Sequence, residues 1–596
     1  MNTKVLNLHD IIRPDNLGTR IAAKWMEWDS LRSPQKGMWA EIRRYVYATD
    51  TQSTTNALLP WKNTTTIPKL CQIADNLHAN YMASMFPTRR WLEWEGNSKD
   101  EETRAKREAI KAYMMYSVNQ KEFKNTVSQL IQDYILNGSC FSTPGWRDDR
   151  VEQGQRQQTG YVGPTLNRIS PYDIVFNPTS PTFEESPKII RSIVSMGDVK
   201  KMLEAFSGTE EARQTAEELW TYLKDVRESV RAYGGDLAVK DEFYQVDGFS
   251  SYQAYLCSDY MELLTFYGDL YDVDNDVYYK NHVFVVVDRH KVIHNAPHSS
   301  NFGYPPIFTV GWRPRPDNLW AMGPLDNLIG MQYRIDHIEN LKADLFDLIT
   351  FPPLKVSGFV EDFKWGPFER IYTGDEGDVQ MMAPNTDPLK ANFELRELEN
   401  KMEEMAGAPK EAMGFRTPGE KTAYEVQRLE NASNRIYQMK IVQFEENLLE
   451  PSMNGMLDEA QSQMDETTVR VFDDEFKLAT FLHLTPSDIV GAGRIKPVAA
   501  RHFVEKAQRV QTLTSFFGSA VGQDQGVLVH FSGIEIAKLM EELMDVENMQ
   551  LVQPYIRLTE QAEGQRIALQ HEEDTNQMLG QSAGMAQDDT SQMMGP

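Results

Sequence analysis

LDNLIGMQYRIDHIENLKADLFDLIT, residues 325–350, carries the clearest helical pattern in a chain of 596 residues. Its apolar residues recur at spacings of three or four, as in Met331, Ile335 and Ile338, which places them on one face of an α-helix. The sequence FPP follows at 351–353, and a proline disfavours helical backbone in the residue before it. The pattern therefore predicts an amphipathic helix of about 25 residues that ends at the two prolines.

The residues after the prolines predict a short β-containing segment and a second helix. LKVSGFVEDFKWGPFERIY is β-like, and the polar turn TGDEGD follows it. Helical spacing resumes in FELRELENKMEEMAG, and Gly407 and Pro409 end it. We therefore expect two helices, 325–350 and 388–407, joined by the segment 351–387.

Residues 160–310 predict an α+β domain with a mainly antiparallel sheet. From about residue 160 to residue 310, strand-like runs recur between turn residues, among them YDIVF, YMELLTFYGDLY and HVFVVVDRHKVI. A helical insert interrupts them at 198–233, and the Gly- and Pro-dense residues 301–324 predict an ordered loop. The first 140 residues are expected to be helical, with helices over Leu17–Asp29, Met38–Val46, the segment after Pro68, Lys99–Ser117 and Glu122–Leu136.

The C-terminal part predicts a long helix, a strand and further helices. Helical spacing is longest over Thr422–Gln463, where Pro451 is expected to kink the helix. TVRVF at 468–472 is strand-like, and helical spacing returns over 498–560. The last 26 residues, 571–596, contain acids but neither Lys nor Arg, and predict a flexible tail.

The composition excludes several classes of protein. Acidic residues outnumber basic ones by 87 to 61, giving a formal charge of −26, which argues against tight non-specific binding to nucleic acid. The three cysteines, Cys71, Cys140 and Cys257, form no Cys-x-x-Cys pair, so a reducing compartment is expected. Neither a secretory leader nor a run of eighteen apolar residues is apparent, so we expect no membrane association.

GFRTPGEKTAY, residues 414–424, comes close to a nucleotide-binding P-loop but departs from it in two ways. The P-loop pattern is G-x-x-x-x-G-K-[ST], and Glu420 stands where its lysine belongs, which leaves Lys421 out of register. A P-loop also joins a buried strand to a helix, whereas the residues before Gly414 have a helical pattern. Nucleotide binding is therefore not expected here.

Other patterns for catalysis or metal binding are incomplete. The acidic run that begins at Asp272 imitates an EF-hand loop, but Val277 and Val283 stand where its Gly and Glu belong. The eleven histidines are scattered, and no G-x-S-x-G elbow is present. We therefore predict no catalytic residue, no metal site and no cofactor, and expect that the protein is not an enzyme.

The order of these parts resembles the portal (head-to-tail connector) proteins of tailed bacteriophages, especially those of short-tailed phages. The resemblance covers about residues 15–560, and the joint order of the parts carries it rather than any single motif. The stretches that are similar to portal proteins are IPKLCQIADNLHANYMASMFP, ISPYDIVFNPTS, LLTFYGDLY, GYPPIFTVGWRPRPDNLWAMGP and APKEAMGFRTPGEKTAYEVQRLENASNR.

The resemblance implies a mainly helical α+β portal fold that assembles as a ring of twelve subunits around a DNA channel. It assigns the parts of the chain as a wing (1–324), a stem helix (325–350), a clip (351–387), a second stem helix (388–407), a tunnel loop (408–421), a long helix returning to the wing (422–497) and a helical crown (498–570), followed by the tail (571–596).

The resemblance also implies a function and a set of partners. Double-stranded DNA would be packaged and ejected through the ring, which would occupy one vertex of the capsid in the virion after assembly in the host cytoplasm. The expected partners are the terminase large subunit, the major capsid and scaffolding proteins, and tail adaptor proteins. Alternatives are another virion structural or ejected internal protein and, resting on the near-P-loop alone, a packaging ATPase.

Three basic residues near the predicted tunnel loop are candidates for weak contact with DNA in the channel: Lys410, Arg416 and Lys421. The alternative is that they pair with the neighbouring acids Glu411, Glu420 and Glu425, because surface charges often form only weak pairs.

The long helix after the tunnel loop needs a cap at its beginning. Either Thr417 or Thr422 could supply it, and Glu425 stands three residues after Thr422, as in a capping box.

Overall fold

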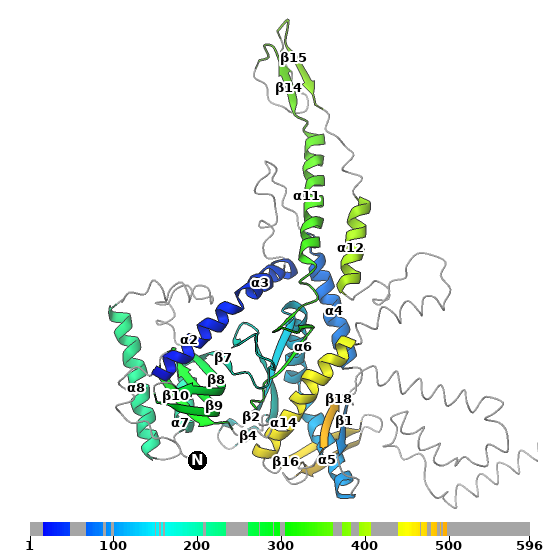
Figure 1. The fold of residues 1–596 in the computed structure, drawn as a ribbon. Coiled ribbons are helices and arrows are strands. Elements are labelled where there is room, and N and C mark those ends of the chain that lie inside the picture. The colour runs from blue at the N-terminus through cyan, green and yellow to red at the C-terminus, as the bar shows by residue number, and fades with distance from the viewer. Residues whose placement is uncertain are drawn as a thin grey trace, which may run out of the picture. The chain divides into compact units, whose positions relative to one another are not determined.

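The computed structural model divides the chain into two units, residues 1–498 and 499–596. All described residues lie in the first unit. They are 16–47, 67–86, 91–96, 101–148, 151–153, 156–158, 161–206, 210–233, 260–272, 275–289, 291–298, 304–361, 372, 374–382, 392–406, 439–464, 467–473, 478–484, 489 and 493–497. The expected crown and tail lie outside them. The described part is a mixed fold of helices and several antiparallel sheets (Figure 1).

A five-stranded antiparallel sheet is the largest in the described part, with strand order β10-β9-β8-β7-β6. Its β-branched and aromatic residues alternate between the two faces, which suits a sheet covered on both sides. The strands are β6 (Ile174–Phe176), β7 (Lys188–Ser195), β8 (Tyr260–Asp272), β9 (Val277–Val287) and β10 (Lys291–Pro297).

Helices cover this sheet through two separate apolar cores. The helix α2 (Asn16–Leu31) packs Ile21 and Trp25 against strand residues such as Phe266. The helices α7 (Met196–Phe206) and α8 (Glu210–Tyr233) share another core with the beginning of β8. The strands and the helical insert at 198–233 therefore follow the sequence pattern.

Many of the other described residues surround a further, mostly helical core. It buries aliphatic and aromatic residues at helical spacing, such as Ile73, Leu77 and Tyr81 of α4, as the pattern after Pro68 predicts. Its helices are α3 (Ser33–Tyr47), α4 (Lys69–Met85), α5 (Glu101–Val118), α6 (Lys121–Leu136) and α14 (Glu450–Gln463). Both α6 and α14 pack against a three-stranded sheet of order β11-β2-β5.

The predicted pair of helices with a β-containing segment between them is present. The helix α11 (Ile329–Thr350) ends just before the two prolines, and α12 (Asn392–Ala406) packs beside it. The strands β14 (Leu354–Ser357) and β15 (Asp378–Met381) pair antiparallel between the two helices. We call residues 329–406 the helical hairpin, and its two strands the tip.

The predicted long helix is described only from residue 439 onward. It continues through Pro451, and the turn just before this proline, η2 (Glu445–Leu449), is π-helical. Because proline lacks an N–H and crowds the preceding turn, a wider turn there keeps the helix continuous. The helix ends at Gln463, as predicted.

Three expectations about strands are wrong. The first 140 residues are not all helical, since β1 (Leu92–Gly96) pairs with β18 (Gly493–Pro497), which lies about 400 residues further along the chain. The β-rich part begins near residue 139 rather than 160. Residues 301–324 contain strands where a loop is expected. The strands concerned are β2 (Ser139–Asp148), β5 (Val162–Ile169), β11 (Phe308–Gly311), β12 (Arg313–Arg315) and β13 (Asn318–Met322).

Two further strand pairs complete the described part. The predicted strand at 468–472 is confirmed within β16, which pairs antiparallel with β17. The pair β3–β4 forms a short hairpin after β2. The four strands are β3 (Val151–Gln153), β4 (Arg156–Gln158), β16 (Thr467–Asp473) and β17 (Leu478–Leu484).

Gly138 gives a direct test of the packing between α6 and the β11–β13 region. Its φ is +73°, and an added Cβ would lie 2.4 Å from the backbone nitrogen of Gly323. Gly138→Ala should lower the free energy of unfolding by about 2 kcal/mol or more, because it combines backbone strain with a clash against main chain. Gly37 lies inside α3 with open space around it, so Gly37→Ala should instead stabilise by about 0.5–1 kcal/mol. Chemical denaturation measures both changes. Equal effects would contradict the close packing of Gly138 against the backbone of Gly323.

Candidate functional site

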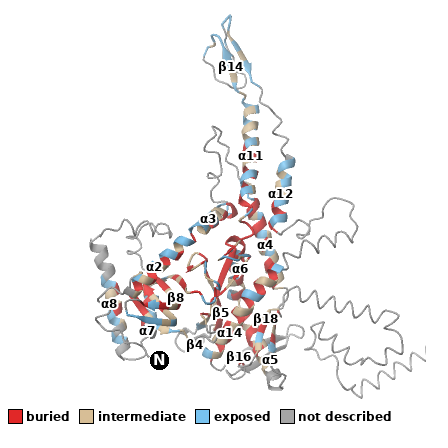
Figure 2. Ribbon diagram, viewed as in Figure 1, coloured by how far each residue is buried: buried red, intermediate tan, exposed pale blue. Residues whose placement is uncertain are grey.

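The helical hairpin exposes apolar side chains along its length. The α11 residues Ile335 and Ile338 are buried, but none of the described residues in 341–401 is (Figure 2). The large exposed hydrophobic residues of this stretch are Leu341, Phe346, Ile349, Phe351, Val356, Phe359, Tyr372, Met381, Met382 and Phe393. Single exposed hydrophobic residues are normal, but a concentration of them marks a surface that another molecule covers.

The tip has little to stabilise it within one chain. It consists of four paired residues on each strand, from Leu354 opposite Met381 to Ser357 opposite Asp378. No described residue of these strands is buried, and the Phe359 side chain just after β14 is 79% exposed. An isolated two-stranded hairpin is at best marginally stable in water. The tip therefore needs further contacts to be well ordered.

The opposite end of the hairpin is held by the beginning of α4. The N-cap residue of α4, Pro68, makes no side-chain cap, so α11 supplies the bonds instead. The side chain of Gln332 accepts from the N–H of Leu70 at 3.3 Å and donates to the carbonyl of Ile67 at 2.6 Å. The Oδ1 of Asp336 accepts from the N–H of Ile67 at 3.0 Å.

The helix α12 is tied to the same place by a buried ion pair. The Nζ of Lys69 lies 2.6 Å from the Oε1 of Glu403, and both side chains are less than one-tenth exposed. A carboxylate near the first turn of a helix also benefits from the helix dipole. We call Ile67, Lys69, Gln332, Asp336 and Glu403 the root of the hairpin.

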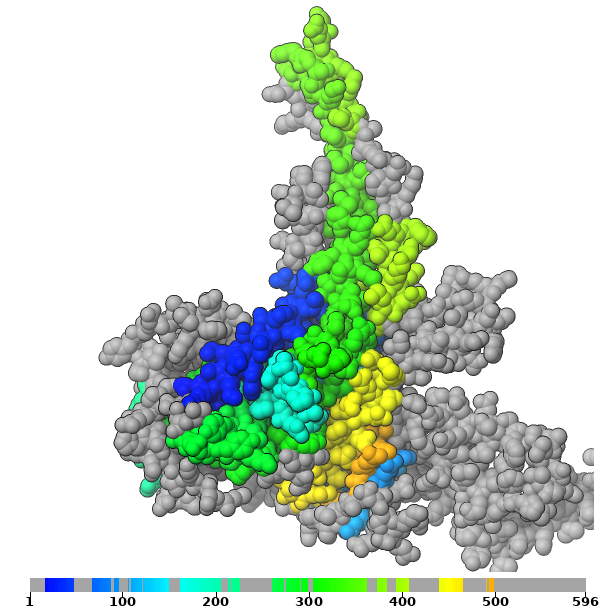
Figure 3. Space-filling model, in the orientation of Figure 1, coloured from blue at the N-terminus to red at the C-terminus, as the bar shows by residue number. Residues whose placement is uncertain are grey.

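The pattern of α11 at the root hides these residues from sequence reasoning. Gln332, Asp336 and Asn340 are buried, and they follow one another at intervals of four on one helix face. A polar helix face normally predicts contact with solvent. The sequence has no signal that separates a solvent-facing polar face from a buried one such as this. Further along the helix, in contrast, the apolar residue Phe346 is exposed. Figure 2 shows the change from buried to intermediate and exposed residues along α11, and Figure 3 shows α11 in green beside α12.

All five residues that the sequence singles out lie outside the described residues. They fall in 407–438, so the structure neither brings them together nor separates them. They are the candidates for DNA contact, Lys410, Arg416 and Lys421, and the capping pair, Thr422 and Glu425.

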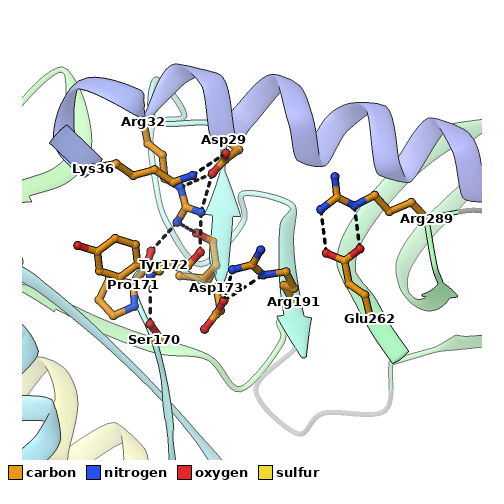
Figure 4. Close-up of polar contacts among 11 residues, drawn as sticks. Asp29, Arg32, Lys36, Ser170, Pro171, Tyr172, Asp173, Arg191, Glu262 and Arg289 are labelled. Atoms are coloured by element: carbon orange, nitrogen blue, oxygen red, sulfur yellow. Dashed lines mark hydrogen bonds and ion pairs between the residues drawn. The ribbon is translucent and has the colours of Figure 1, made fainter. Parts of the chain in front are cut away.

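A second concentration of charge lies where α2 and α3 meet the sheet (Figure 4). Arg32, between the two helices, is fully buried. Its guanidinium donates to the carbonyl oxygens of Pro171, Tyr172 and Ile174 at 2.5–2.7 Å. It also donates to the carboxylate of Asp29 at 2.7 and 2.8 Å. One side chain thus holds the ISPYDI turn against both helices.

The carboxylates of this cluster are all paired. Burial pushes the pKa of Asp29 upward, but Arg32 and Lys36 outweigh it and leave the pKa below its ordinary value. Paired carboxylates of this kind are poor proton donors and acceptors near neutral pH, so the cluster is suited to support rather than catalysis. The pairs, at 2.7–2.8 Å, are Asp29 with Arg32 and Lys36, Asp173 with Arg191, and Glu262 with Arg289 (Figure 4).

The described residues contain no group of three or more His, Cys, Asp or Glu side chains arranged to hold a metal ion. None of the described helices combines the length and the apolar character that crossing a bilayer requires. Comparison with protein-family models and with curated proteins gives no match to this chain.

The root should make the stability of the fold depend on pH through Asp336. Burial raises the pKa of Asp336 to about 6, although bonds from Ile67 and Gln332 act in the opposite direction. The unfolded chain releases this proton near pH 3.9, so the stabilisation by this group is complete below about pH 4 and is lost as the pH rises through about 6.

Asp336→Asn removes this titration. Relative to the variant, the wild type should lose on the order of 1–3 kcal/mol of unfolding free energy between about pH 4 and pH 7. Chemical denaturation of both proteins across this range measures the difference. A difference that stays constant with pH would mean that Asp336 titrates normally in the folded chain.

Arg32→Met tests the role of the charged cluster. The change leaves three backbone carbonyls without their donor, so we expect a loss of about 3 kcal/mol or more in the free energy of unfolding. Arg44 is exposed near the end of α3, so Arg44→Met should change stability by about 0.5 kcal/mol or less. Similar losses in the two variants would show that Arg32 is not the support described.

Proposed function

We propose that this chain is a subunit of a portal-type ring, a channel through which double-stranded DNA passes at one vertex of a bacteriophage capsid. The observation that carries the proposal is the helical hairpin, whose far part is apolar and uncovered. The resemblance of about residues 15–560 to portal proteins supplies the rest of the proposal, in which α11 and α12 are the stem and residues 351–387 are the clip.

A second copy of this chain suits the uncovered surface. The exposed residues lie on α11, on the tip and on α12, so one neighbour running alongside the hairpin can cover them together. When the same two different patches meet between every pair of neighbours, the contact is heterologous, and it generates a closed ring if the rotation closes. A neighbour at the tip would also supply the contacts that two short strands lack.

The charge of α12 supports a path for DNA rather than a site that holds it. The helix carries five glutamates against two basic residues, Arg396 and Lys401. Lys401 is paired with Glu397 at 2.7 Å, and Glu394 with Arg334 of α11 at 3.1 Å. Each phosphate contact adds affinity and salt dependence, so a surface with excess carboxylate lets a duplex pass without retention.

The remaining parts of the proposal rest on the resemblance to portal proteins. Lys410, Arg416 and Lys421 are proposed to contact passing DNA transiently from the tunnel loop. The clip is proposed to dock the terminase motor during packaging and tail adaptor proteins afterwards, and the outer part of the ring to contact capsid and scaffolding proteins. We assign no catalytic step to the chain.

Replacing Phe346 and Phe351 by glutamate tests the proposed assembly. The two side chains are 57% and 62% exposed in the single chain, so the double variant should fold normally. Burying the new charges between neighbours should cost about 2 kcal/mol or more per contact, roughly 30-fold in affinity. Electron microscopy and light scattering should show rings with a central hole for the wild type, and single chains for the variant.

A matched control separates charge from size. The double change Phe346→Leu and Phe351→Leu keeps the surface apolar and should preserve the ring. Rings of equal yield from the glutamate variant would place the contact elsewhere, and a wild type that stays monomeric at every concentration would overturn the proposal.

A further inference from the structure

Among the buried polar atoms without a hydrogen-bond partner, two lie on facing helices near the root. They are the hydroxyl oxygen of Tyr45 on α3 and the Oδ2 of Asp336 on α11, and the two residues are 3% and 0% exposed. A buried donor or acceptor without a partner is destabilising, so such atoms are few in native proteins. One of these atoms can donate a hydrogen bond and the other can accept one.

The two groups belong to facing surfaces of α3 and α11. The ring of Tyr45 packs edge-on against Tyr333, with centroids 5.5 Å apart and an interplanar angle of 85°. Tyr333 precedes Asp336 by three residues, which puts both side chains on neighbouring positions of one helix surface. Burial and then the charge of Asp336 raise the pKa of the Tyr45 hydroxyl, so the two groups lie within electrostatic reach of each other.

The other groups around the root are already engaged. The Oδ1 of Asp336 accepts from Ile67 and Gln332, both at 3.0 Å. The charged residues of α4 and α12 at this place, Lys69 and Glu403, pair with each other. This leaves the Oδ2 of Asp336 as the acceptor for an approaching donor.

Two charged residues of α3 also act on Tyr45. Glu41 raises the pKa of its hydroxyl and Arg44 lowers it. Both act on the hydroxyl less than Asp336 does, so Asp336 is the charged group with the largest effect on it.

We propose that Tyr45 and Asp336 form a latch between α3 and the helical hairpin, closed by a hydrogen bond from the tyrosine hydroxyl to the ionised carboxylate. In the structure both atoms lack a partner, which is the open arrangement, and a movement of α11 against α3 that brings them together closes the latch. A phenol bound to a carboxylate is a charge-assisted bond, stronger than a neutral one. Protonation of Asp336 removes the charge, so this one contact between α3 and α11 weakens in mild acid. The fold as a whole still gains stability there, because a protonated carboxyl costs less to bury than a carboxylate.

The latch acts within one chain, and it stands whether or not the chain forms a ring. Its consequence is mechanical, because α11 carries the tip and is joined to the body through the root. Closing the latch ties the beginning of α11 to α3 by a hydrogen bond, in addition to its bonds with Ile67 and Leu70. Opening it leaves those bonds and the ring contact of Tyr45 with Tyr333.

A double-mutant cycle on the full chain tests the latch. The variants are Tyr45→Phe, Asp336→Asn and both together, and the readout is amide hydrogen exchange in the first half of α11 at neutral pH. Tyr45→Phe should speed this exchange about ten-fold or more in the wild-type background, because a bond to a charged group is lost. The same change should have no effect when Asp336 is already Asn. Tyr47, exposed on the same helix, gives the control variant Tyr47→Phe, which should leave the exchange unchanged.

The latch is overturned if Tyr45→Phe fails to speed hydrogen exchange in α11. If the hydroxyl lacks a partner in every populated arrangement, Tyr45→Phe only removes a buried polar group, so exchange becomes slower or stays the same in both backgrounds. Should Asp336→Asn fail to fold, wild type and Tyr45→Phe are compared at neutral and mildly acidic pH, with rates referred to an unstructured peptide. The effect of Tyr45→Phe must then shrink in acid, and an undiminished effect excludes Asp336 as the partner.

Discussion

The arrangement of the first unit depends on how the beginning of α4 is held between the two helices of the hairpin. This helix begins at a proline and lacks a side-chain cap of its own, so its first N–H groups are satisfied by α11 through Gln332 and Asp336. Lys69 adds an ion pair to α12. Hydrogen bonds, including those of a close ion pair, require particular distances and angles, whereas the hydrophobic effect is not directional. The root therefore fixes the register of both helices against the body.

A surface helix of a monomer normally buries its apolar residues and exposes its polar ones, and α11 of the hairpin does the reverse. Near the root, Gln332 and Asp336 are buried, and further along α11 Phe346 and Ile349 are exposed. In a monomer the exposed apolar surface is unfavourable, because each side chain gives up the free energy of burial. Covering the hairpin with another molecule would recover that energy, and this is the reason why we propose an identical neighbour as its partner.

The helices could be predicted from the sequence because their signal is local. Apolar residues three and four apart identify α2, α4, α6 and α11 to within a few residues, and prolines mark the end of α11. The strand β1 could not be predicted in this way, since it forms only by pairing with β18 far along the chain. The strands inside 308–322 are hidden by prolines and glycines that suggest a loop.

The candidate site was predicted only in outline. Hydrophobic periodicity identifies the two helices, but it does not show which part of the apolar face is covered, because burial depends on what packs there. Buried polar residues such as Asp336 and Glu403 look like solvent-facing positions, and their role is visible only with Lys69 and Ile67 beside them. The basic residues of the predicted tunnel loop stay a prediction, since they lie outside the described residues.

On the proposal that the chain assembles into a ring, the root of the hairpin contributes to folding and its far end contributes to assembly. At the root, burial and directional bonds act within one chain, so the orientation of α11 is set before any partner arrives. At the tip, four residues on each strand and exposed side chains such as Met381 contribute little by themselves. A hairpin that is oriented first and completed later loses less conformational entropy on association than one that must order along its whole length. The same division fits the placement of buried polar side chains at the root, where direction matters, and of exposed apolar side chains at the far end, where area matters.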